Sequence, residues 1–148
     1  MLNKGQSMVV NALIDYINDN YQFEGKYRLA FDELQTSKNS ICLTTSSETA
    51  PYEKIADVTG TAYTGTVTLA IVYRVMKTEK GIQDLEHIGV VDSLYDFIKA
   101  NYKSVKSEDF FIDKITQNSG GKLDATYSGG IKDFRGIFTL NYERMASV

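Results

Sequence analysis

The 148-residue chain predicts an α+β fold in which two amphipathic helices pack on one face of a β-sheet. Two stretches carry apolar residues at helical spacing, several others alternate at strand spacing, and their order is one helix, several strands, one helix, several strands. Two helices cannot cover both faces of a sheet of roughly six strands, so a two-layer sandwich is the economical arrangement. We therefore predict a single domain over residues 1–148 with an antiparallel or mixed sheet.

The first helix is predicted over residues 2–21, because its apolar side chains recur on one stripe. That stripe consists of Val9, Val10, Leu13, Tyr16, Ile17 and Tyr21.

The second helix is predicted over residues 83–102, and Leu85 points away from its stripe, so regular helix is expected from about Glu86 onward. Its stripe consists of Val90, Val91, Leu94, Phe97 and Ile98, with Tyr95 and Tyr102 on the flank.

Alternating residues predict strands between the two helices. The strongest run is 66–76, where one face is wholly apolar and the other is rich in threonine, as expected for a strand covered on one side. Residues 46–53 carry the only proline and are expected to form an exposed loop. The weaker strand predictions are 27–32, 41–46 and 54–59.

The C-terminal third is predicted to be three strands, 109–116, 122–127 and 131–144, separated by Ser-Gly-Gly at 119–121 and at 128–130. Both Ser-Gly-Gly segments are expected to be hairpin turns, because glycine adopts the positive φ that such turns need. The sheet face away from the helices is expected to be uncovered within one chain and rich in Thr, Asn and charge.

The charge balance argues against a surface that grips nucleic acid. Sixteen Lys and Arg against nineteen Asp and Glu give a net charge of −3, whereas phosphate binding needs clustered positive charge. No apolar run approaches the roughly 18 residues of a membrane span, and residues 1–5 lack the apolar core of a signal peptide. One cysteine excludes an internal disulfide and favours a reducing compartment.

Little in the sequence favours catalysis or metal binding. His87 and Cys42 could in principle act as base and nucleophile, but no activating motif surrounds Cys42, and a structural histidine and a half-buried thiol are the commoner interpretation. Asp92 and Asp96 lie one turn apart on a helix flank, where we expect solvated charge. No metal-ligand spacing occurs, so we predict no enzyme activity, no cofactor and no metal.

The element order and three stretches resemble the tail-terminator or minor capsid (tail completion) proteins of long-tailed phages that infect Gram-positive bacteria. The stretches are Asn11–Ile17, the block from Ala56–Gly60 through Val67–Arg74 into Val91–Ile98, and the final strand Gly136–Tyr142. They cover most of the chain at the level of pattern, and none of them is a catalytic motif.

This resemblance implies a structural virion protein, assembled in the host cytoplasm and located at the tail–head junction. Such a chain forms a homo-oligomer, a hexameric ring that stops tail-tube polymerisation. The ring contacts the tail-tube protein on one side and the head-completion or connector protein on the other. DNA passes through the lumen without specific binding, and no membrane is involved.

Two alternatives stay open. The chain could form another neck or tail ring, as a head-completion stopper or tail-tube subunit, or it could be a small ligand-binding α+β domain, which would need a concave pocket with converging polar groups.

Contacts between subunits or with partners are expected on loops and on the threonine-rich strand face. The candidate residues are Glu48, Pro51 and Tyr52 in the first loop, Thr66 and Thr68 on the strand, and Lys77, Thr78, Glu79 and Lys80 before the second helix.

Overall fold

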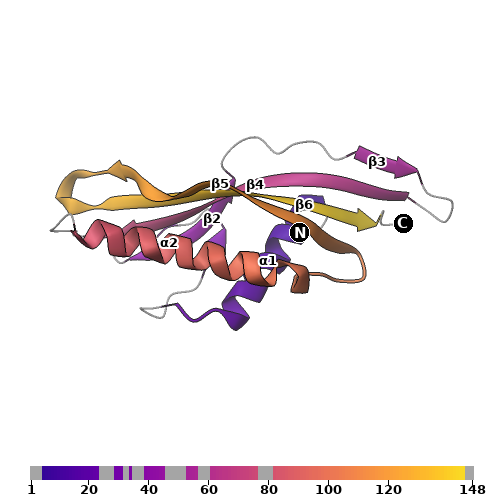
Figure 1. Cartoon of the computed structure of the whole chain (residues 1–148), viewed down its shortest axis with the longest axis horizontal. Coiled ribbons are helices and arrows are strands. Elements are labelled where there is room, and N and C mark those ends of the chain that lie inside the picture. Colours follow the sequence, from indigo (N-terminus) through magenta and orange to yellow (C-terminus); the bar gives the residue numbers. More distant parts are fainter. Residues whose placement is uncertain are drawn as a thin grey trace.

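The computed structural model describes residues 5–23, 29–31, 34, 39–45, 53–56, 61–76 and 82–145 (Figure 1). The elements in chain order are α1 (Gly5–Asn20), β1 (Ala30–Phe31), β2 (Ser40–Thr45), β3 (Glu53–Ala56), β4 (Thr61–Val75), α2 (Ile82–Asn101), the 3-10 turn η1 (Tyr102–Ser104), β5 (Phe110–Thr126), the turn η2 (Ser128–Gly130) and β6 (Lys132–Met145).

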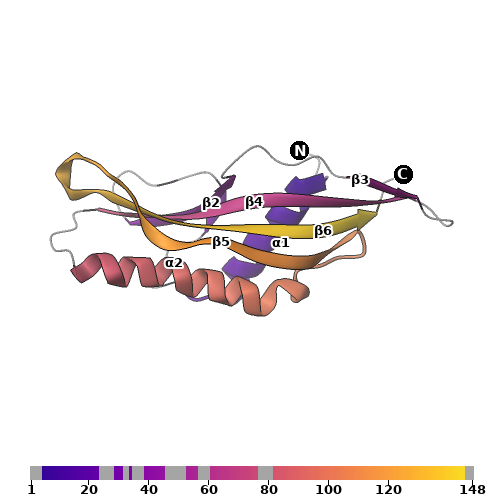
Figure 2. The same ribbon diagram turned by 45° about the horizontal axis from the view of Figure 1, so that its top comes forward.

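The strands form one mixed sheet in the order β1-β2-β4-β6-β5, and β3 pairs with the start of β4. Only β1 and β2 run parallel; the other pairs are antiparallel. The three long strands β4, β6 and β5 make a ribbon along the long axis, and both helices lie against the same side of the sheet (Figures 1 and 2). The predicted α+β two-layer sandwich is therefore confirmed.

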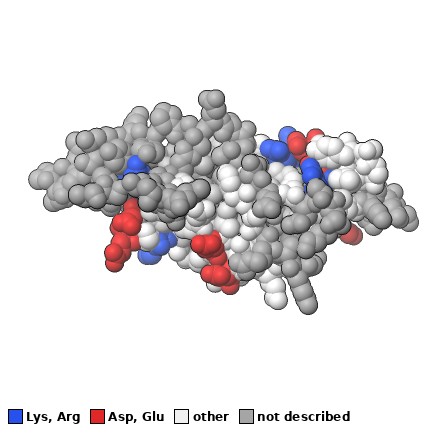
Figure 3. All heavy atoms as spheres, turned by 180° about the vertical axis from the view of Figure 1, so that it is seen from behind, with Lys and Arg blue, Asp and Glu red and all other residues white. Residues whose placement is uncertain are grey.

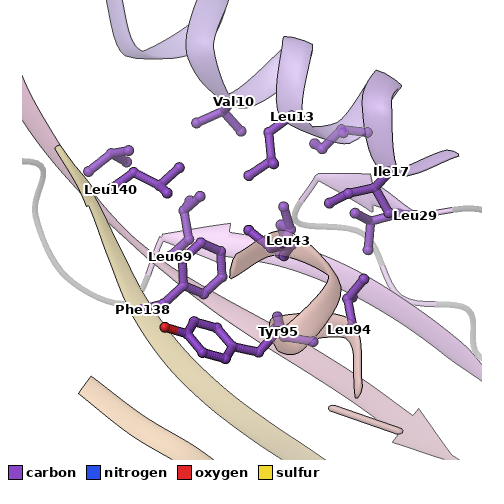
Figure 4. Close-up of a cluster of buried hydrophobic side chains, with 14 of the residues drawn as sticks. Val10, Leu13, Ile17, Leu29, Leu43, Leu69, Leu94, Tyr95, Phe138 and Leu140 are labelled. Carbon is purple, nitrogen blue, oxygen red and sulfur yellow. The ribbon is translucent and has the colours of Figure 1, made fainter. Parts of the chain in front are cut away.

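One continuous core joins the two helices to the sheet. The apolar face of β4 aligns with that of β6, so that Val67 is opposite Leu140 and Leu69 is opposite Phe138. Leu13 of α1 and Leu94 of α2 are both buried over these strands (Figure 4). Full burial of each such side chain stabilises the fold by roughly 1.5–3 kcal/mol, so this core accounts for the layered arrangement.

Aromatic side chains join the two helices directly. The Phe97 ring of α2 lies 5.0 Å from the Tyr21 ring and 6.1 Å from the Tyr16 ring, centroid to centroid. The Tyr16 hydroxyl donates to Asn101 Oδ1 at 3.2 Å, and the Tyr21 hydroxyl is 3.1 Å from Ser93 Oγ. The predicted helical stripes are thus largely correct, although Tyr95, expected on the flank, is buried in the core.

The prediction of two hairpin turns in the C-terminal third is wrong for the first. Residues 110–126 form one strand, β5, and Ser119–Gly121 is an irregular stretch within it. Four register shifts interrupt the pairing of β5 with β6, as expected where extra residues are inserted as β-bulges. Only 128–130 turns the chain, with Gly129 at φ 83° and Gly130 at φ 80°.

Two element starts also differ from prediction. The helix α2 begins at Ile82, so Leu85 lies inside regular helix with its side chain 70% exposed. The strand β4 begins at Thr61 and runs through Gly65, because its first residues pair with both β3 and β6. None of the described helices is long and apolar enough to cross a bilayer.

The sheet face away from the helices is less open than predicted. Cys42, Ala70 and Val72 are buried on this face and form a small second cluster, against which Leu34 and Ile137 pack. Neighbouring strands bring these short apolar side chains together, which the sequence of a single strand does not reveal.

Candidate functional site

The candidate site is the polar part of the helix-free side of the β4–β6–β5 ribbon. Strand side chains alternate between faces, so the residues between the core positions of β4 and β6 all project to this side. We call it the polar face; on β4 and β6 it consists of Thr66, Thr68, Arg74, Asp133, Arg135, Thr139, Asn141 and Glu143.

Its centre is a chain of neutral hydrogen bonds across three strands. The Thr139 hydroxyl donates to Asn118 Oδ1 at 2.8 Å and lies 3.0 Å from the Thr68 hydroxyl. A hydroxyl has one proton, so Thr68 is the donor to Thr139. These hydrogen bonds connect one polar side chain from each of β4, β6 and β5, and none of the three is charged.

At the hairpin end of the face, a carboxylate is enclosed by two partners. Asp133 accepts from Arg74 Nε at 2.7 Å and from Arg74 Nη2 at 2.8 Å, and the Tyr127 hydroxyl donates to it at 3.0 Å. The guanidinium carbon of Arg74 is 5.2 Å from the centroid of the Tyr127 ring. The hydrogen bonds that Arg74 donates to Asp133 raise the pKa of Arg74 above its ordinary value.

The other arginine of the polar face with a described partner is also neutralised. Arg135 Nε lies 3.3 Å from Asp124 Oδ2. On the edge strand, Lys114 is opposite Asn141 and Lys122 is opposite Arg135. Six residues of β6 separate these two pairing positions, so the lysines lie roughly 20 Å apart along the sheet. Seen from behind in Figure 3, the described residues show small separate groups of both acidic and basic side chains.

A shallow polar hollow occupies the opposite end of the face. It is lined by Thr64, Gly65, Thr66, Asp113, Asn141, Tyr142 and Glu143. Asp113 and Glu143 are in no ion pair with the described residues. The hollow is open and is lined mainly by acidic and neutral polar residues, whereas a small-molecule pocket is mostly apolar.

The structure does not bring His87 and Cys42 together. His87 lies on the helix side, with its ring 5.8 Å from that of Tyr73 and 5.4 Å from that of Phe134. Cys42 is buried on the other side of the sheet. Burial lowers the pKa of His87 despite the nearby carboxylates, which is the environment of an aromatic packing residue.

Asp92 is not the solvated charge that we predicted. Its Oδ1 accepts the backbone N–H of Gly121 at 2.6 Å and so fixes the irregular stretch of β5 against α2. The paired glycines were the available signal, because glycine inside a strand often marks a bulge or a close backbone approach. Asp96 is exposed, as predicted.

Of the predicted contact residues, Thr66 and Thr68 lie on the polar face. The others stay predictions, because they lie outside the described residues: Glu48, Pro51, Tyr52, Lys77, Thr78, Glu79 and Lys80.

Among the described residues, no group of three or more His, Cys, Asp or Glu side chains is placed to hold a metal ion. A scan against models of known protein families and a search of curated proteins both give no match. The functional assignment therefore depends on the sequence pattern and on the geometry of the polar face.

Proposed function

We propose that this chain is a structural virion protein that forms a ring at the head-proximal end of a phage tail. The ring ends tail-tube polymerisation and joins the tail to the connector of the head. The observation that supports this role best is the polar face, a sheet surface that no described helix covers. The buried cluster of Cys42, Ala70 and Val72 interrupts it, and beside that cluster the Thr68, Thr139 and Asn118 side chains are neutral and bonded to one another.

Such a surface suits the wall of a channel through which DNA must slide. Clustered lysine and arginine would hold phosphates and release counterions, which makes binding tight. On the polar face Arg74 and Arg135 are paired with acids, Lys114 and Lys122 are far apart, and Asp113 and Glu143 add negative charge. DNA would therefore meet a surface that neither grips it nor reads its sequence.

The alternative of a ligand-binding domain receives less support, because the hollow on the polar face is open and polar. A stopper or tail-tube subunit would also form a ring, and the position of the chain in the particle separates these roles.

Localisation in assembled particles tests the proposal. Gold-labelled antibody against the chain is expected to mark one site per particle, where the tail meets the head. Label along the whole tail would identify a tube subunit instead, and particles without label would exclude a virion role. Antibody against a known capsid protein controls for access and particle integrity.

A further inference from the structure

We infer that a groove in the helical layer binds a basic segment of a partner protein. The groove has a volume of about 510 Å³ and lies between the residues that follow α1 and the middle of α2. Both helices are on the side of the sheet away from the polar face (Figures 1 and 2), so this inference goes beyond the proposed contact with DNA. The lining of the groove includes Tyr21, Phe23, Glu86, Gly89, Val90 and Ser93.

Interactions within the chain hold the aromatic wall of the groove in place before a partner arrives. The Tyr21 hydroxyl lies 3.1 Å from Ser93 Oγ, and the Tyr21 N–H donates to the Ile17 carbonyl at 2.8 Å. The Tyr21 ring centroid lies 4.8 Å from that of Phe23 and 5.0 Å from that of Phe97. A wall that is ordered in the free protein loses little conformational entropy on binding.

The floor of the groove is open at Gly89. A Cβ on Gly121 would lie 2.8 Å from a backbone carbonyl oxygen, whereas no described atom lies within 4 Å of a Cβ on Gly89. Glycine inside a helix destabilises the helix relative to alanine, and no close packing requires glycine at position 89. The space beside the half-buried Val90 is therefore open to a side chain that comes from outside.

The charge of the helical layer determines the sign of the partner. The helix α1 contains two acids and no lysine or arginine, and α2 contains four acids and one lysine, whereas the whole chain has 16 basic against 19 acidic residues. Glu86, the acid that lines the groove, is exposed and forms no ion pair with another described residue. A positively charged segment therefore complements this layer, and an acidic segment is repelled.

These features favour an arginine next to an apolar side chain. A guanidinium matches the geometry of a carboxylate such as that of Glu86 better than an ammonium does, and aromatic rings such as those of Tyr21 and Phe23 attract it further. An apolar neighbour of the arginine would cover Gly89 and Val90. The partner is thus a peptide segment that combines both kinds of side chain, rather than a small inorganic cation.

Fluorescence anisotropy with a synthetic peptide tests the chemistry of the partner. The probe is the labelled peptide Gly-Arg-Leu-Arg-Gly, and the wild-type chain is expected to bind it saturably. Replacement of both arginines by glutamate should abolish binding, and replacement of the leucine by serine should weaken it about tenfold. No saturable binding of the first peptide, or equal binding of all three, would overturn the inference.

Variants of the chain test the place of binding. Glu86→Lys is expected to weaken binding of the first peptide about tenfold or more, because the guanidinium loses its partner and meets a like charge. Asp96→Lys is the matched control, since it changes the charge of α2 equally. Ten residues of helix, roughly 15 Å, separate it from Glu86, beyond the screening length of about 8 Å at physiological salt, so binding should change less than about twofold.

Gly89→Leu should abolish binding, because the added side chain fills the groove. Melting temperatures within a few degrees of the wild type show that each variant keeps its fold. Equal weakening by Glu86→Lys and Asp96→Lys would refute the groove, since binding would then follow overall charge, and so would unchanged binding by Gly89→Leu. Sedimentation identifies a different occupant: a wild-type chain that self-associates, with Gly89→Leu monomeric, would show that a second copy fills the groove and would overturn the inference.

Discussion

At the scale of single residues, two glycines determine how closely α2 approaches the ribbon. A Cβ on Gly136 would lie 2.9 Å from Val91 Cγ1, and a Cβ on Gly121 would lie 2.8 Å from the Ile88 carbonyl oxygen. Val91 itself is fully buried. The helix α2 therefore packs directly against the backbone of β5 and β6 at these two glycines, and a side chain at either position would push α2 outward.

Gly136→Ala should consequently destabilise the fold by about 1–3 kcal/mol, the usual cost of overpacking a core. Gly89→Ala is the matched control, because nothing lies within 4 Å of its added Cβ and alanine favours helix. We expect Gly89→Ala to stabilise by up to about 1 kcal/mol. Urea unfolding measures both changes, and equal effects of the two substitutions would contradict the close seating of α2.

His87 should make stability depend on pH in a defined direction. Burial lowers its folded-state pKa below the ordinary 6.5, so below about pH 6.5 the unfolded chain takes up a proton before the folded chain does. The contribution of neutral His87 to the free energy of unfolding is complete above pH 6.5. It declines as the pH falls through that value and levels off below the folded-state pKa.

His87→Gln removes this titration, so the free energy of unfolding of the wild type minus that of the variant should decrease between about pH 7.5 and pH 5. Denaturant unfolding at several pH values measures the difference. A difference that stays constant, or increases toward acid pH, would show that His87 is not buried as described.

At the scale of elements, the contacts of Asp133 hold the turn end of the β5–β6 hairpin to the end of β4. Asp133 is 5% exposed, and its carboxylate accepts two hydrogen bonds from Arg74 and one from Tyr127. Asp133→Asn should destabilise the protein by about 1–3 kcal/mol, because the half-buried guanidinium loses its charged partner. Asp124→Asn, in a more exposed pair with Arg135, should cost about 0–1 kcal/mol.

Hydrogen exchange shows which part of the chain loses stability in Asp133→Asn. Amides of 122–134 should exchange faster in Asp133→Asn, while those of α1 keep their wild-type rates. Equal acceleration in both regions would indicate global destabilisation without a specific role in the hairpin.

Sequence periodicity was sufficient for the helices and for the core face of β4, because each of these depends on side chains a few residues apart. The same local pattern was insufficient for β5. Its continuity through Gly120 and Gly121 depends on Asp92, which is 29 residues away from Gly121 in the chain. The burial of Cys42 and Val72 likewise depends on pairing between β2 and β4, and the mutual neutralisation of Arg74 and Asp133 depends on pairing between β4 and β6.

At the scale of the whole molecule, the two layers have different tasks in the proposed ring. The helical layer encloses the core and fixes the ribbon. In that ring the polar face would be the side that faces DNA. The candidate loops around Glu48 and Lys77 would then contact the tail tube and the head connector, as predicted from the sequence.

Tail length in the absence of this chain tests the central claim most directly. Negative-stain images of particles assembled without it are expected to show tubes of variable and excessive length, unattached to filled heads. Supplying the wild-type chain should restore tails of one length joined to heads. Tails of normal length attached to heads in the absence of the chain would contradict a role in terminating the tail.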